Sequence, residues 1–182
     1  MEDNHQLIPQ VLDDLPQGVL RVEWTTDGTT LSANMGNELT PTQVCTPPDI
    51  ITWDQADSEN LFTLLMVDLD PTIQDESNKY EVIHWLVFNI PGNDVGKGTT
   101  HAEYIGPLPP KNTGVHRYVY FVFKQTGPVT PKDAYRPFSH ERRLPFRTRE
   151  LCNQYEFAKP VAGNYFIAQY DDNVDSMAAK LL

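Results

Sequence analysis

The sequence predicts a mostly β fold in which antiparallel sheets form a sandwich and the few helices come late in the chain. Short runs rich in β-branched and aromatic residues recur along the chain, and each has the length of a strand. Turn-forming clusters of Gly, Pro, Asn and Asp separate these runs, which argues against an alternating α/β fold. The strand-like runs are residues 61–67, 84–90, 115–123 and 165–170, and the turn clusters are residues 91–94, 127–128 and 162–164.

The first predicted strand covers residues 19–24. Leu20, Val22 and Trp24 alternate with more polar neighbours, as in a strand with one buried face. Residues 40–48 follow as an extended segment with three prolines, which suits a sheet edge or a loop.

Two helices are predicted near the C-terminus. Residues 147–155 place Leu151 and Tyr155 four positions apart, with Thr148 as the predicted N-cap. Residues 175–182 have high helix propensity and an acidic start that suits the helix dipole. No domain boundary stands out, so residues 1–182 are expected to form a single domain.

Composition places the chain among ordinary soluble globular proteins. The 182 residues are 40% hydrophobic and 21% charged, which is enough to bury a core without disulfides or metals. The formal net charge of −11 opposes nonspecific attraction to nucleic acid and to anionic membranes, so peripheral membrane contact is the most we expect. The net charge does not exclude a small anionic ligand, because the local charge of one pocket can be opposite in sign to the net charge of the protein.

The two cysteines, Cys45 and Cys152, form no disulfide framework and no zinc motif. The N-terminal sequence lacks the basic and apolar regions of a signal peptide, and no apolar run reaches the ~20 residues of a membrane helix. The expected location is therefore cytoplasmic.

Some segments resemble enzyme motifs without matching them. Residues 92–99 resemble a phosphate-binding P-loop, but three residues rather than four separate the first two glycines, and Gly98 follows Lys97, so a hairpin turn is expected. Asp68 and Asp70 have a spacing that permits a divalent metal, yet no nucleotide-binding pattern accompanies them. A hydrolase that uses Asp68 and His116 stays open, since a distant serine could approach either central histidine. We expect no enzyme and no cofactor.

Four polar residues stand at the ends of neighbouring predicted strands: Asp68, His84, His116 and Tyr118. If the strands pack side by side, these side chains meet at one rim and suit an oxyanion. The imidazoles would face the anion, Asp68 would orient one imidazole, and Tyr118 would donate a hydrogen bond. Histidine chemistry predicts that ligand affinity changes between about pH 5 and 8.

The other prominent residues of these segments are expected to have structural roles. Pro109 and Pro110 supply rigid walls without N–H groups. Arg117 alternates away from its neighbours and is expected in a structural ion pair. The remaining histidines, His5, His101 and His140, are expected at the surface.

Several motifs, taken in order, resemble the phosphatidylethanolamine-binding protein family, which includes the Raf kinase inhibitor proteins of animals. The most specific are the double proline at residues 109–110 and the His-Arg-Tyr sequence at residues 116–118. The resemblance covers roughly residues 15–175. The matching segments are residues 39–43, 52–53, 67–71, 84–89, 92–94, 104–110, 114–118 and 160–164, with Ala168, Asp171 and Asp172.

The resemblance implies a large central antiparallel sheet packed on a smaller sheet, with short C-terminal helices. It implies a small cavity for phosphate, phosphoethanolamine and phospholipid headgroups, and a non-enzymatic protein that modulates signalling. The alternative is a kinase or serine-protease regulator that acts through its surface and retains only a vestigial pocket. The ligand-binding residues expected by motif position are Asp68, Asp70, His84, Leu108, Pro109, Pro110, His116 and Tyr118.

The chain departs from the family pattern at three places. Residues 68–72 read Asp-Leu-Asp-Pro-Thr where the family has Asp-Pro-Asp-Ala-Pro, which reshapes one lip of the cavity. In the loop at residues 106–110, Pro107 removes a backbone donor and Leu108 adds bulk. Ala178 or Met177 stands where mammalian members carry a tyrosine over the pocket, so a more open or more apolar lid and weaker headgroup binding are expected.

Overall fold

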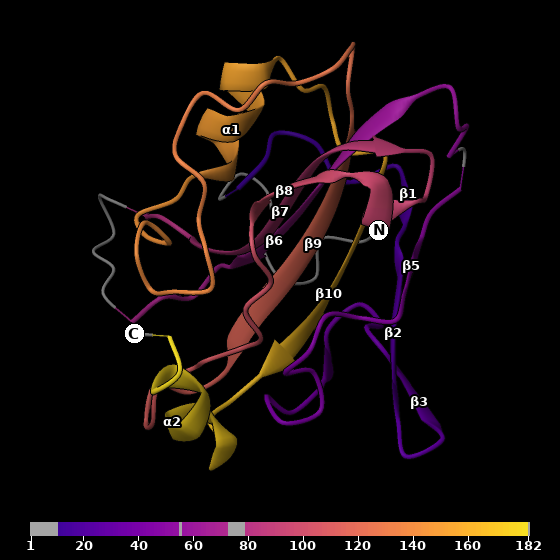
Figure 1. Ribbon diagram of the computed structural model, residues 1–182. Coiled ribbons are helices and arrows are strands. Elements are labelled where there is room, and N and C mark those ends of the chain that lie inside the picture. Colours follow the sequence, from indigo (N-terminus) through magenta and orange to yellow (C-terminus); the bar gives the residue numbers. More distant parts are fainter. Residues whose placement is uncertain (1–10, 55, 73–78, 182) are drawn as a thin grey trace.

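The computed structural model describes residues 11–54, 56–72 and 79–181, and in these residues the strands form two sheets (Figure 1). The larger sheet has the strand order β1-β10-β9-β6-β7-β8, and β4 also pairs with β10. Its strands are β1 (Gly18–Val19), β4 (Asn37–Glu38), β6 (Leu61–Asp68), β7 (Val82–Pro91), β8 (Thr99–Ala102), β9 (His116–Lys124) and β10 (Ala162–Ala168). The smaller sheet has the order β3 (Thr29–Ser32), β2 (Arg21–Thr26), β5 (Ile50–Thr52).

The pairing directions confirm the predicted arrangement of a large sheet on a smaller one, with one refinement. The pairs formed among β6, β7, β8, β9 and β10 are antiparallel, as are both pairs of the smaller sheet. The two short strands β1 and β4 instead run parallel to β10, so the larger sheet is mixed at that edge. Parallel neighbours need long connections, and residues far apart in sequence supply them here.

The helices are short. The predicted helix at residues 147–155 is α1 (Thr148–Tyr155), but Thr148 is not its N-cap: it lies inside the first turn, and its backbone N–H donates to the Glu81 carboxylate at 2.6 Å. The tail helix α2 (Asn173–Ala178) begins and ends earlier than predicted, and Leu182 lies outside the described residues. The P-loop-like segment is a turn with the 3-10 helix η1 (Val95–Lys97), and it joins the antiparallel pair β7 and β8 as expected. None of the helices in the described part of the chain is long and apolar enough to cross a membrane.

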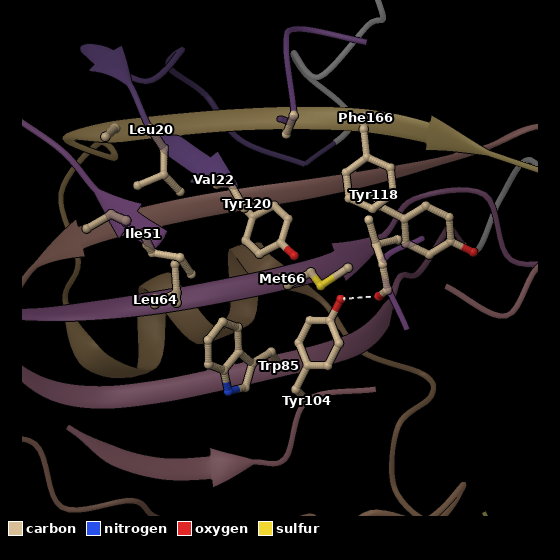
Figure 2. Packing of buried hydrophobic residues seen from close by; sticks show 14 of the residues in the cluster. Leu20, Val22, Ile51, Leu64, Met66, Trp85, Tyr104, Tyr118, Tyr120 and Phe166 are labelled. Carbon is tan, nitrogen blue, oxygen red and sulfur yellow. Dashed lines mark hydrogen bonds between the residues drawn. The ribbon is translucent and has the colours of Figure 1, made fainter. Parts of the chain in front are cut away.

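Both faces of the larger sheet are covered, which explains why its strands are continuous apolar runs. In β6, Leu64 and Met66 point to one face and Leu65 and Val67 to the other, and all four are fully buried. The first face packs on the smaller sheet; we call this the inner cluster (Figure 2), and it includes Leu20, Val22, Trp24, Leu64, Met66, Trp85, Tyr104, Tyr118, Tyr120 and Phe166.

The second face packs on α1, which Figure 1 shows on the opposite side of the larger sheet from β2, β3 and β5. We call this layer the outer cluster, and it includes Leu65, Val67, Ile83, Leu86, Phe88, Phe121 and Leu151. Since burying one such side chain contributes roughly 1.5–3 kcal/mol, the two clusters dominate the stability of the fold.

Candidate functional site

The register of the larger sheet brings all four of the predicted polar residues to one end. Strand β6 ends at Asp68, and Asp68 lies opposite Tyr118 on β9 and opposite Val82 on β7. Because β7 and β9 both run antiparallel to β6, their first residues lie beside its last. His84 and His116 are near these starts. The convergence expected at one rim is therefore what the strand pairing produces.

His84 owes its position to a β-bulge. Met66 of β6 pairs with Trp85 and Val67 pairs with Ile83, so His84 is the extra residue between them. The bulge also changes the phase of β7, since Ile83 and Leu86, three positions apart, both join the outer cluster. A bulge leaves its extra residue outside the regular ladder, and here it aims the imidazole at the end of the inner cluster.

A cavity of about 250 Å³ opens at this end of the sheet. Five of the eight residues predicted for ligand binding contribute to its walls: Asp68, His84, Leu108, Pro110 and His116. The complete wall consists of Asp68, Pro71, Thr72, Tyr80, Val82, Ile83, His84, Ile105, Leu108, Pro110, His116, His140, Arg143, Leu144 and Leu181.

The other three predicted residues lie elsewhere. Asp70 holds Arg117 through a two-pronged ion pair, with 2.7 Å from Nε to Oδ2 and 2.7 Å from Nη2 to Oδ1, as expected for Arg117. Pro109 is buried and does not contribute to the cavity wall. The Tyr118 ring belongs to the inner cluster, and in Figure 2 its hydroxyl points away from the other labelled side chains.

His116 is held from both sides. Its Nδ1 lies 2.8 Å from Asp68 Oδ2, and its Nε2 lies 2.8 Å from Thr113 Oγ1. The Thr113 hydroxyl also lies 2.7 Å from the Pro110 carbonyl and donates to it, so it accepts from His116. A hydrogen on each ring nitrogen then satisfies all of these contacts, which makes the pair an imidazolium and a carboxylate. Both side chains are almost fully buried, with exposed fractions of 2% and 7%.

His84 is in the opposite electrostatic state. Its Nδ1 lies 2.8 Å from the Ile105 carbonyl, which can only accept, so Nδ1 carries the hydrogen and Nε2 is the acceptor nitrogen of the neutral ring. Burial lowers the pKa of His84 below its ordinary value, although the charge of Asp68 and the Ile105 carbonyl act in the other direction. Nε2 of the neutral ring can therefore accept a hydrogen bond or a proton from a ligand.

The Tyr118 hydroxyl is buried and makes no regular hydrogen bond within the described residues, but the Asp68 carboxylate and the Leu108 backbone lie close enough to act on it. Its ring makes an edge contact with His84, with 5.2 Å between centroids, and a stacked one with His116 at 6.5 Å. Burial, and next the charge of Asp68, raise the pKa of this phenol well above its ordinary value, so it stays a donor. Tyr118 does not contribute to the cavity wall, so its part in the site is to pack its ring against the two imidazoles as a member of the inner cluster.

Arg143 is a wall residue that the sequence did not predict. Its buried guanidinium donates mainly to backbone carbonyls, among them Glu103 at 2.8 Å and Pro137 at 2.5 Å. Burial, and next the charge of Arg136, lower its pKa to about 10, so it remains charged at neutral pH. It therefore places a positive charge in the cavity wall, and it also fixes the loop that carries Leu144.

The other histidines differ from expectation in one case. His101 was predicted at the surface, but it is 4% exposed; it packs on Phe88, and its Nε2 lies 2.9 Å from Asp133. His140 is exposed as predicted and lies at the mouth of the cavity. His5 lies outside the described residues.

The departures from the family pattern can now be placed. Pro71 and Thr72 of the altered lip and Leu108 of the altered loop all line the cavity. Neither Ala178 nor Met177 does so, and the tail contributes Leu181 instead. Gly106 anchors the loop, because a Cβ there would lie 2.9 Å from the Cys45 Cα atom. In the described part of the chain, no group of three His, Cys, Asp or Glu residues could hold a metal ion.

Comparison with protein-family models shows to which family the chain belongs. The family model for the phosphatidylethanolamine-binding protein matches residues 21–166, which is most of the chain. The chain belongs to this family. The match confirms the resemblance predicted from the motifs, and it contains every cavity-wall residue from Asp68 to Leu144.

Individual relatives agree. The chain is 32% identical over 177 residues to the Drosophila melanogaster protein named "Putative odorant-binding protein A5", covering 97% of this chain and 82% of that protein. The solution structure of CG7054 superposes with a TM-score of 0.72 and 38% identity, covering 97% of this chain and 98% of that one. A carboxypeptidase Y inhibitor, solved in complex with its cognate proteinase, gives a TM-score of 0.68 and 26% identity, covering 86% and 85%.

Proposed function

We propose that the protein is a non-enzymatic binding protein for small phosphate-type anions, such as phosphoethanolamine and phospholipid headgroups, and that it modulates signalling through this ligand. The observation that carries the proposal is the cavity of about 250 Å³ whose wall brings His84 and His116 together with the positively charged Arg143. Membership of the phosphatidylethanolamine-binding protein family supports the same ligand class.

The charges of the site suit such an anion. The Asp68 carboxylate is offset by the His116 imidazolium at 2.8 Å, so it does not repel a ligand as a lone charge would. Arg143 adds a buried positive charge to the wall. A protonated ligand oxygen would donate to Nε2 of His84, and the remaining phosphate oxygens would be attracted by the positive charge of Arg143. The Thr113 hydroxyl lies 2.8 Å from His116 Nε2, but it donates its hydrogen to the Pro110 carbonyl rather than to the imidazole, so it is not activated as a nucleophile in this arrangement.

Calorimetric titration with phosphoethanolamine tests the proposal. We expect the His84→Gln variant to bind about 10- to 100-fold more weakly than the unmodified protein, the loss typical for a hydrogen bond to a charged group. The His101→Gln variant is the matched control, since His101 is equally buried and lies outside the cavity wall. Unchanged affinity in His84→Gln, with normal folding, would reject the proposed site.

Binding should also take up a proton. Because burial lowers the pKa of His84, the free protein is neutral there at pH 7.5, while the phosphate is mainly a dianion. A hydrogen bond between Nε2 of His84 and a phosphate oxygen needs one hydrogen. Binding therefore requires about one proton, carried by either the imidazole or the phosphate. We expect an uptake of about one proton per ligand at pH 7.5, and affinity that rises as the pH falls from 8 towards 6. Titrations in two buffers of different ionisation enthalpy measure this uptake, and a value of zero would contradict the roles given to His84 and the phosphate.

A second candidate function is protease inhibition through the surface, and the similarity to the carboxypeptidase Y inhibitor favours it. In that case the pocket would be dispensable. An inhibition assay against carboxypeptidase Y separates the two functions: His84→Gln would keep inhibition while losing phosphoethanolamine binding. Joint loss of both would assign the inhibition to the pocket.

A further inference from the structure

We propose that the protein has a second binding site, a groove that takes an extended, arginine-containing segment of a partner protein. The groove lies between the edge strands β5 and β8 and reaches down to β7. Among the described residues, none lines both this groove and the cavity at the end of the larger sheet. The proposal therefore goes beyond the function proposed above and is tested separately from it.

Two sheet edges bound the groove. Among the described residues β5 pairs with β2 alone, and the outer edge of β8 carries a single bridge, between Ala102 and Arg136. Ile51 of β5 and Thr100 of β8 line the groove. A free edge presents backbone N–H and C=O groups with which an extended chain can pair. The shape therefore suits a peptide segment in a β conformation.

The groove is also large enough for side chains of a partner. Its volume is about 390 Å³, against about 250 Å³ for the cavity at the end of the sheet. Trp85 and Val87 of β7, both members of the inner cluster, line it together with Pro47 and Pro48. This part of the wall offers an aromatic and hydrocarbon surface.

The charged residues of the groove are acidic. Asp49 and Asp94 line it, and none of the described wall residues is a lysine or an arginine. Asp49 is exposed, and its Oδ2 accepts from the Thr25 backbone N–H at 2.6 Å, a contact that does not neutralise its charge. Asp94 pairs with Lys97 at 2.8 Å, but the Lys97 side chain is 75% exposed, so the pair contributes little and can open. The groove therefore complements a cation, and the net charge of −11 attracts one.

Trp85 supplies an observation that is independent of the charges. It is 9% exposed, and its indole N–H makes no hydrogen bond with the described residues, whereas that of Trp24 donates to the Thr46 carbonyl at 2.9 Å. In Figure 2 the indole nitrogen of Trp85 lies on the side of the ring away from Tyr120. Since Trp85 lines the groove, an acceptor atom bound there, such as a backbone carbonyl of the partner segment, would satisfy this donor.

Arginine is the side chain that fits these groups best. Its planar guanidinium can lie against the indole ring and donate to the Asp49 and Asp94 carboxylates, and it loses its water more readily than an ammonium group does. A lysine would bring the same charge without the flat surface. Phosphate-type anions are repelled by the two carboxylates, so the groove and the cavity select ligands of opposite charge.

An NMR titration of the isotope-labelled protein with the peptide acetyl-Val-Arg-Val-Arg-Val-amide tests the proposal. The indole N–H signal of Trp85, identified by its loss in Trp85→Phe, should shift progressively as peptide is added, while that of Trp24 should not. The same peptide with citrulline in place of arginine keeps the shape without the charge, and it should bind at least about tenfold more weakly. The lysine peptide should fall between the two. Equal binding of the arginine and citrulline peptides, or an unshifted Trp85 signal at millimolar arginine peptide, would overturn the proposal.

Further measurements locate the peptide in the groove. Asp49→Asn keeps an oxygen for the Thr25 N–H but removes the charge, so it should weaken binding of the arginine peptide about threefold. Asp27→Asn is the matched control, since Asp27 is exposed in the turn between β2 and β3 and does not line the groove. Saturating phosphoethanolamine should leave the affinity for the peptide unchanged. Equal affinities in Asp49→Asn and Asp27→Asn, or displacement of the peptide by phosphoethanolamine, would place the peptide elsewhere and refute the inference.

Discussion

Replacing Asp68 by alanine is expected to lower the free energy of unfolding by roughly 3–5 kcal/mol, the cost of leaving one partner of a buried ion pair alone. Asp68 is the only acidic partner that the structure gives His116 Nδ1 within the described residues, at 2.8 Å. Its second oxygen accepts from the Asp70 backbone N–H at 2.8 Å, so that bond is lost too. Urea denaturation followed by circular dichroism measures the effect.

A second His–Asp pair in the same protein supplies the control. His101 and Asp133 are 2.9 Å apart, but the Asp133 side chain is 46% exposed against 7% for Asp68. We therefore expect Asp133→Ala to cost about 1 kcal/mol or less. In the double variant Asp68→Ala/His116→Leu much of the loss should return, because no buried charge is left without a partner. A cost below 1 kcal/mol for Asp68→Ala would show that the pair is not charged, or that water reaches it freely.

Glu81 is expected to give the protein a stability that falls between pH 4.5 and about pH 8. Burial raises the pKa of Glu81 to about 7. The hydrogen bond from the backbone N–H of Thr148 favours the ionised form and acts in the opposite direction, but its effect is smaller. Folding therefore favours the protonated carboxyl. Its contribution is fully present below the ordinary pKa of 4.5 and is lost as the pH rises through 7. At about 1.4 kcal/mol per pH unit, this difference amounts to about 3 kcal/mol.

The Glu81→Gln variant removes this dependence. Glutamine stays neutral at every pH and keeps an oxygen for the Thr148 N–H. The variant should match the unmodified protein at pH 4.5 and exceed its unfolding free energy by about 3 kcal/mol at pH 9, as measured by urea denaturation at each pH. Glu150→Gln is the control, since Glu150 lies in the first turn of α1 with 71% of its side chain exposed. If Glu81→Gln shows the same pH dependence as the unmodified protein, Glu81 is ionised in the folded state at neutral pH.

The strands were predictable because both faces of the larger sheet are buried. That burial demands long apolar runs, and such runs in β6, β7 and β9 are visible without any structure. The polar residues that close each run were predictable for the same reason, since an abrupt change from apolar to charged marks the rim. Asp68 and His116 could therefore be assigned to one site from the sequence.

The exact set of residues that lines the cavity was harder to predict from the sequence. Nothing in the sequence marks the β-bulge at His84, because a bulge depends on the register of two strands that are distant in sequence. Tyr118 was expected in the wall on its position near the strand start. Its alternation with Tyr120 and Val122 instead places the ring in the inner cluster.

The residues that were missed or misplaced lie in three segments: Arg143 between β9 and α1, His101 on β8, and Leu181 after α2. Arg143 carries its charge into the interior because its hydrogen bonds go to backbone carbonyls, which leave no signal in the sequence. His101 was assigned to the surface from its polar neighbours, but it is covered by a pairing with Asp133, thirty-two positions later. Both cases need tertiary contacts that residue spacing does not encode. Leu181 was missed because the tail helix ends before it.

The central claim is that His84 and His116 face one anion site, and histidine NMR during a phosphoethanolamine titration tests it most directly. The Cε1–H signals of the histidines are followed in one sample, so His101, which packs on the outer cluster, is an internal control. We predict that the signals of His84 and His116 move together along one binding curve while that of His101 stays in place. Signals of His84 and His116 that remain unmoved at millimolar phosphoethanolamine would contradict the account.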